Sequence, residues 1–243
     1  MKTKNLLYAC PFLFFTQTYA DYGIIQDLDG YVNVRESDSL KSKVTEKLNN
    51  GDVVSCNFEQ SDASFCYALF DVNGRSGSGF VHKSRVNFFN GFQKWAFKKS
   101  TSNEAIYNHG QNQLHITVQS PQLSTRHFKK SAELYSHYKN KKFFGTDGTL
   151  PDQDKLYQFA QIKLRYDRKI TIIPKQNLEQ YFFPNKPLDP GGLQDHQMSE
   201  IYSKGKNVYI FNSLSNGGAT QYTLFLHIQD GKLIKQSAWS EHL

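Results

Sequence analysis

The cysteines are the residues of this chain with the greatest capacity for covalent chemistry. Cys56 and Cys66 are separated by nine residues. That separation suits two neighbouring antiparallel strands joined by a short loop, where opposite Cβ atoms come close enough to bridge. We predict one disulfide, which would stabilise the fold by about 2–3 kcal/mol through closure of a short loop. The alternative is a pair of buried free thiols. A disulfide would consume both candidates for a thiol nucleophile.

The remaining reactive side chains show no catalytic pattern. No Gly-x-Ser-x-Gly nucleophile motif occurs, and Asn216-Gly217-Gly218-Ala219 lacks the lysine of a phosphate-binding loop and is typical of a surface turn. Asp152 and Asp154 follow Pro151, as carboxylates often do at the start of a helix. The histidines are scattered and none has the spacing of zinc ligands: His82, His109, His115, His127, His137, His196, His227 and His242. We expect no catalytic site, no metal and no cofactor.

The first twenty residues have the layout of a secretory signal peptide. Lys2 and Lys4 precede an apolar run over residues 6–15, and Ala20 offers a small residue at the cleavage position. A buried N-terminal helix is the alternative, and a lipid attached to Cys10 is a second one. Export predicts a periplasmic or secreted protein in which disulfides persist. A nucleic-acid partner is not expected for such a protein.

The whole chain, this segment included, is polar in composition. The hydrophobic fraction is 38% and the mean hydropathy is −0.60, and no later run is long enough to span a membrane. A formal net charge of +7 favours anionic partners, such as an acidic protein or envelope phosphates. Aromatic residues make up 14% of the chain, which favours strands and binding surfaces.

Short strand-like runs fill residues 21–90, and turn residues punctuate them. Asn73-Gly74 is a strong signal for a tight hairpin, because both positions accept a positive φ. Many short strands at close spacing predict a small β-barrel, for which a disulfide would compensate a marginal core. The expected strands are residues 31–35, 44–48, 53–58, 65–72, 79–82 and 85–88.

Four segments of this region share an order and spacing with a known family. They are Val32-Asn33-Val34-Arg35, Ser42-Lys43-Val44, Asn50-Gly51-Asp52-Val53-Val54 after Leu48, and Gly79-Phe80-Val81-His82. Together they resemble the bacterial SH3 domain over residues 22–90. The tryptophan usual in the family's middle strand is absent, and Phe65-Cys66-Tyr67 occupies that region. The resemblance implies binding of cell-wall peptide or of an envelope protein.

Aromatic and basic side chains of this region are the candidate ligand-binding residues. The aromatic rings would line a groove, and one of two arginines would pair with a ligand carboxylate. The alternative is that the rings fill a small core and the arginines are solvated. The candidates are Tyr31, Phe65, Tyr67 and Phe80 for the groove, and Arg35 and Arg75 for the carboxylate.

The second half predicts an α+β domain on an antiparallel sheet, so that the chain as a whole is mostly β. After a junction at residues 91–110, the domain covers residues 111–243. We expect a helix from Ser124 or Thr125 to about Tyr138, with Phe128, Ala132 and Tyr135 on one face. Strands are expected at 114–118, 159–166, 170–173, 207–211, 221–229 and 232–239, and a short helix at 177–182.

A basic segment runs from Arg126 to Lys142, over the expected first helix and the residues that follow it. Six cations oppose the single acidic Glu133: Arg126, Lys129, Lys130, Lys139, Lys141 and Lys142. Such a surface suits an acidic protein or an envelope phosphate. The alternative is a solvated helix face.

These features favour an exported, non-enzymatic binding protein whose SH3-like domain recognises cell-wall peptide or an envelope protein. One alternative is a periplasmic immunity or inhibitor protein that blocks a toxin directed at the cell wall. Another is a hydrolase whose catalytic residues form no recognisable motif.

Overall fold

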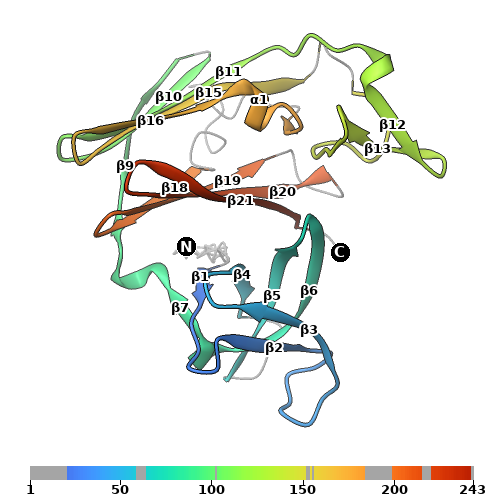
Figure 1. Cartoon of the computed structure of the whole chain (residues 1–243), viewed down its shortest axis with the longest axis vertical. Helices are drawn as coiled ribbons and strands as arrows, with labels where there is room; N and C mark the ends of the chain where they lie inside the picture. Colours follow the sequence, from blue (N-terminus) through green and yellow to red (C-terminus); the bar gives the residue numbers. More distant parts are fainter. Residues whose placement is uncertain are drawn as a thin grey trace, which may run out of the picture.

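The computed structural model describes residues 21–58, 64–101, 103–151, 154, 156–183, 199–214 and 220–241. The candidate signal peptide, Asp152, the Gly-rich stretch at 216–219, His196 and His242 lie outside these residues. Within them the chain is mostly β, and all strand pairs are antiparallel, as the sequence predicts. Figure 1 shows three stacked layers of strands with a small hairpin at one side.

The first layer, the N-terminal sheet, curls around its own core. Its order is β3-β2-β6-β5-β4-β1-β7. Alternation along its strands turns one face inward, where Val34, Leu48, Phe70 and Val81 are buried. Its strands are β1 (Asp21–Ile25), β2 (Tyr31–Arg35), β3 (Val44–Asn49), β4 (Val53–Asn57), β5 (Phe65–Val72), β6 (Arg75–His82) and β7 (Val86–Phe88).

Two further antiparallel sheets face each other and enclose the largest core. The middle sheet has the order β21-β20-β19-β18-β8, and the outer sheet has the order β16-β15-β11-β10-β9 with β17 beside β15. The middle sheet contains β8 (Gln93–Lys94), β18 (Ser199–Lys204), β19 (Asn207–Leu214), β20 (Tyr222–Gln229) and β21 (Lys232–Ser240). The outer sheet contains β9 (Ala96–Ser100), β10 (Glu104–His109), β11 (Asn112–Gln119), β15 (Tyr157–Tyr166), β16 (Lys169–Pro174) and β17 (Phe182–Phe183).

Residues 91–110, expected as a junction, carry strands of both sheets. β8 pairs with β18 in the middle sheet, and β9 pairs with β10 in the outer sheet. Trp95 lies between β8 and β9, is buried in the shared core, and donates its indole N–H to Ser203 Oγ at 3.0 Å. This tryptophan therefore anchors the crossing from one sheet to the other.

The helix expected at residues 124–138 is wrong. The segment forms a single 3-10 turn at Thr125–His127 and then a hairpin of β12 (Phe128–Ser131) and β13 (Leu134–Tyr138), which is extended by β14 (Lys141–Lys142). Phe128 pairs directly with Tyr138, and their rings lie 4.8 Å apart. Ala132 has a φ of 57°, so its backbone lies in the left-handed region and turns the chain. A helix would need the right-handed α conformation at this position.

Helix is correspondingly scarce in the part of the chain that the structure describes. The expected helix at 177–182 is replaced by the shorter α1 (Lys175–Leu178), which lies a few residues earlier. None of the helices in the described ranges is both long and apolar enough to cross a membrane.

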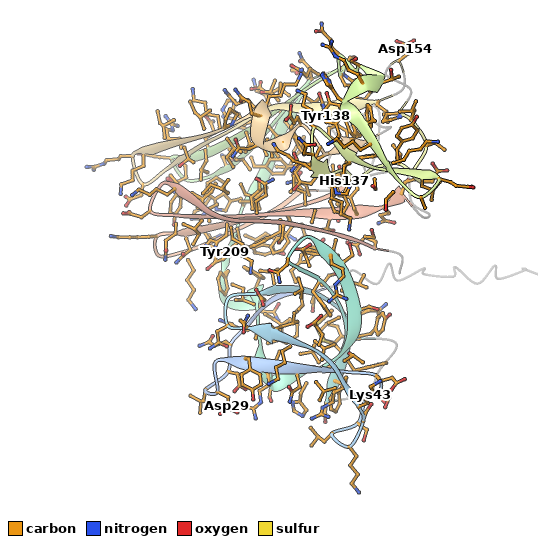
Figure 2. All side chains as sticks on the ribbon, turned by 45° about the vertical axis from the view of Figure 1, so that its right-hand side comes forward. Asp29, Lys43, His137, Tyr138, Asp154 and Tyr209 are labelled. Carbon is orange, nitrogen blue, oxygen red and sulfur yellow. A yellow bond between two sulfur atoms is a disulfide. The ribbon has the colours of Figure 1, made fainter. Side chains whose placement is uncertain are left out.

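An aromatic cluster joins the N-terminal sheet to the middle sheet. Tyr22 stacks on Phe211 with centroids 4.0 Å apart and contacts the edge of Trp239. The Tyr22 hydroxyl shares hydrogen bonds with Ser213 Oγ at 3.1 Å and Thr223 Oγ1 at 3.4 Å. Figure 2 shows Tyr209, another member of the cluster, on the middle sheet where it faces the N-terminal sheet. These contacts make the first two layers one packed unit.

Candidate functional site

Three of the six predicted ligand-binding residues lie in one row across the N-terminal sheet. Arg35 on β2 is paired with Phe80 on β6, and Phe80 is paired with Tyr67 on β5. All three side chains are half-buried, while the neighbours on their strands, such as Val34 and Val81, are fully buried. Because neighbours in a strand point to opposite faces, the row lies on the face turned away from the core.

The two rings of this row form an edge-to-face pair. The centroids of Tyr67 and Phe80 are 5.3 Å apart and the rings are inclined by 65°, a favoured aromatic geometry. On the next row of the same hairpin, Phe65 contacts the edge of His82 at 5.1 Å. Phe65 is only 4% exposed, so it supports the neighbouring row instead of offering a contact surface.

Arg35 supplies the cation of the row. Its Nη1 donates to the carbonyl oxygen of Ser42 at 2.7 Å, which holds the guanidinium and leaves most of its five donors for a ligand. Ser42 is next to Lys43, which Figure 2 shows at the end of the molecule farthest from the middle sheet. The guanidinium therefore points toward a part of the N-terminal sheet that the other layers do not cover.

Gly79 allows β2 to approach β6 closely enough to form the row. A Cβ at this position would lie 2.5 Å from Val34 Cγ1 and 2.9 Å from the carbonyl oxygen of Arg35, and its φ is 155°. Any larger residue would push β2 away from β6. The glycine thus determines the distance between Arg35 and Phe80.

The disulfide that the sequence predicts joins β5, one strand of the row, to the neighbouring β4. Cys56 on β4 and Cys66 on β5 are bonded, with Cα atoms 5.4 Å apart, and both are fully buried. Tyr67 follows Cys66 directly and points to the opposite face. The crosslink therefore fixes the backbone from which Tyr67 projects.

Arg75 and Tyr31 do not join the row. Arg75 is an odd number of residues from Phe80 on the same strand, so it projects from the other face, where it forms an ion pair with Glu46 and is 73% exposed. Tyr31 lies four residues before Arg35, about 13 Å along β2. The Lys47 ammonium sits 4.2 Å from the centre of its ring.

The basic segment is partly neutralised within the fold. Lys139 and Lys141 both reach the carboxylate of Glu179, at 2.6 and 3.5 Å, and Lys130 lies over the Tyr135 ring. Arg126 and Lys129 are exposed. The hairpin thus presents a weaker positive surface than six neighbouring cations would.

Two histidines outside the row make structural contacts. His115 lies between Glu104 and Gln113, with nitrogen–oxygen distances of 2.8 and 3.0 Å. Burial and nearby Lys235 lower the pKa of His227 to about 4, so its ring is neutral near pH 7. The described residues contain no group of three or more histidine, cysteine or carboxylate side chains arranged to hold a metal ion.

The aromatic cluster between the sheets was not expected from the sequence. Aromatic side chains occupy alternate positions of two neighbouring strands, Tyr209 and Phe211 on β19 and Phe225 and His227 on β20. This alternation is the sequence signal of an aromatic face on a sheet.

Comparison with known proteins found no matching family model, no matching curated protein and no matching solved structure.

Proposed function

We propose that this chain is an exported, non-enzymatic binding protein. It recognises a peptide that carries a carboxylate, either in the cell wall or on an envelope protein, and it binds this peptide through the Arg35–Phe80–Tyr67 row. The observation that carries this proposal is the register of three strands. It aligns one guanidinium with two partly exposed rings on the face of the N-terminal sheet that is turned away from its core.

The chemistry of the row suits such a ligand. A guanidinium binds carboxylates through paired hydrogen bonds, and Arg35 uses one nitrogen on the Ser42 carbonyl. The edge-to-face rings give an apolar contact for the peptide body. The N-terminal sheet curls around its own core, and this supports an SH3-like interpretation of residues 22–90.

The disulfide supports a location in the periplasm or outside the cell. Disulfides persist in the periplasm and outside the cell and are rare in the cytosol. Cys56 and Cys66 are bonded and buried, so export is the setting in which this fold is most stable.

Binding to purified cell wall tests the proposal. The protein comprising residues 21–243 would be compared with Arg35→Met and with Arg75→Met, a matched change on the opposite face. Losing one charge-assisted contact weakens binding at least about tenfold, so we expect Arg35→Met to reduce the bound fraction and Arg75→Met to leave it unchanged.

Equal binding by the three proteins, or no binding by any of them to cell wall or to an envelope protein, would overturn the assignment of the row. Capture of one stoichiometric protein from an envelope extract, lost in Arg35→Met, would identify a protein segment as the ligand. Inhibition of a cell-wall hydrolase by that complex would favour the immunity or inhibitor alternative.

A further inference from the structure

A separate cleft of about 400 Å³ lies beside the hairpin formed by β12, β13 and β14. The hairpin forms one wall, and the start of β20 and the end of β21 form the other. Figure 2 shows His137 and Tyr138 of this hairpin at the side of the two stacked sheets. The residues of the cleft that matter below are Tyr135, Ser136, Lys142, Phe144, Thr146 and Ser240.

Lys142 is the cation of the cleft, and its charge is poorly compensated. Its Nζ donates to the carbonyl oxygen of Gly74 at 3.3 Å and lies 4.9 Å from the centre of the Phe144 ring. No carboxylate in the described ranges lies within 4.0 Å of this ammonium, whereas Lys139 and Lys141 on the same hairpin both reach Glu179. Burial lowers the pKa of Lys142, and the nearby Asp71 charge offsets part of this lowering without forming an ion pair.

Hydroxyl groups and aromatic rings complete the walls. Ser136 Oγ lies 2.8 Å from His137 Nδ1, and Thr146 Oγ1 contacts the carbonyl oxygen of Thr149 at 3.3 Å. Each hydroxyl keeps capacity for a further hydrogen bond. The rings of Tyr135 and Phe144 provide apolar wall. Cavities of this size with a few converging polar groups are typical of small-molecule sites.

We propose that this cleft binds a sugar-sized carboxylate, with the carboxylate on the Lys142 ammonium, the ligand hydroxyls on Ser136, Thr146 and Ser240, and the ligand ring against Phe144. A single lysine matches a singly charged carboxylate. A phosphate monoester carries about −1.5 to −2 charges near pH 7, which would exceed the charge of this site. The cleft is built from other residues than the Arg35 row, so it is independent of the function proposed above.

The test uses pairs of sugars in which only one member carries a carboxylate. Glucuronic acid would be compared with glucose, and N-acetylmuramic acid with N-acetylglucosamine, by NMR titration of the ¹⁵N-labelled protein comprising residues 21–243. We expect at least one acid to bind about tenfold or more tightly than its neutral partner, as one charge-assisted contact implies. The amide shifts should concentrate at residues 141–146.

Variants assign the preference to Lys142. Lys142→Met should abolish the difference between acid and neutral sugar, while Lys129→Met, which removes an exposed cation of the same hairpin outside the cleft, should preserve it. Equal affinity within both pairs, shifts elsewhere, or a preference that survives Lys142→Met would overturn the proposal. If Lys142→Met does not fold, the location of the shifts in the unaltered protein decides. Tighter binding of inorganic phosphate would overturn the choice of a carboxylate.

Discussion

Acidification should weaken this fold through His227. The ring stacks on Tyr209 with centroids 4.3 Å apart, and its Nε2 lies 2.9 Å from the amide oxygen of Asn207. Lys235, its cross-strand neighbour, forms an ion pair with Asp52 of the N-terminal sheet. Burial and the Lys235 charge lower the pKa of His227 from 6.5 to about 4. The folded protein therefore holds this imidazole neutral.

The sign follows from the two pKa values. Between pH 6.5 and 4 the unfolded chain binds a proton at His227 that the folded chain does not, so stability rises with pH in this window. The contribution is fully present above pH 6.5 and is lost as the pH falls toward 4. At 1.36 kcal/mol per pKa unit the full shift corresponds to about 3 kcal/mol. The ring is partly exposed, and solvent screening reduces the expected effect to about 1–2 kcal/mol.

Urea unfolding at several pH values between 7 and 4.5 would measure this effect. His227→Gln removes the titration and retains a group that can donate to Asn207. Carboxylates also titrate in this range, so the informative quantity is the difference between the two proteins. We expect the difference in unfolding free energy to change by about 1–2 kcal/mol in favour of the variant as the pH falls. Parallel pH profiles would refute this explanation.

Three other changes test the supports of the fold and of the row. Replacing both Cys56 and Cys66 by alanine should lower the unfolding free energy by about 2–3 kcal/mol, and an unchanged denaturation midpoint would contradict the bracing role of the disulfide. Phe211→Ala should lower the unfolding free energy by about 3–5 kcal/mol, because the ring is fully buried against Tyr22. Phe97→Ala, at a ring that is 37% exposed, should lower it far less. Similar losses of unfolding free energy for the two variants in denaturant would argue against a packed interface. Gly79→Ala should separate β2 from β6 and weaken cell-wall binding. Gly91→Ala, at a position where a Cβ meets no atom within 4 Å, should bind cell wall normally. Equal binding by the two variants would show that the row does not depend on the close approach of β2 to β6.

Strands and tight turns were predictable because their signals are local. Asn73-Gly74 and Asp230-Gly231 both adopt positive φ at the two central turn positions, as their sequences predict. The helix predicted at residues 124–138 is wrong although Phe128, Ala132 and Tyr135 follow a helical spacing. In the structure Phe128 pairs with Tyr138 across a hairpin, and both rings are buried against Phe182. Phe182 is distant in sequence, so its contribution could not be foreseen.

The candidate site was predictable in its residue types but not in its arrangement. Parity along β6 separates Arg75 from Phe80, and this could have been worked out once the strand was assigned. The pairing of Arg35 with Phe80 required knowledge of which strands are neighbours in the sheet. The cleft around Lys142 could be foreseen even less, because its walls come from the hairpin, the start of β20 and the end of β21.

Calorimetric titration with a cell-wall stem peptide tests the central proposal most directly. The peptide would be used with a free C-terminal carboxylate and in its amidated form, against the unaltered protein and Arg35→Met. We predict that amidation weakens binding to the unaltered protein at least about tenfold, as loss of one charge-assisted contact implies, and that Arg35→Met binds both peptides with the same low affinity. Equal affinity of the unaltered protein for the two peptides, or a carboxylate preference that survives Arg35→Met, would contradict it.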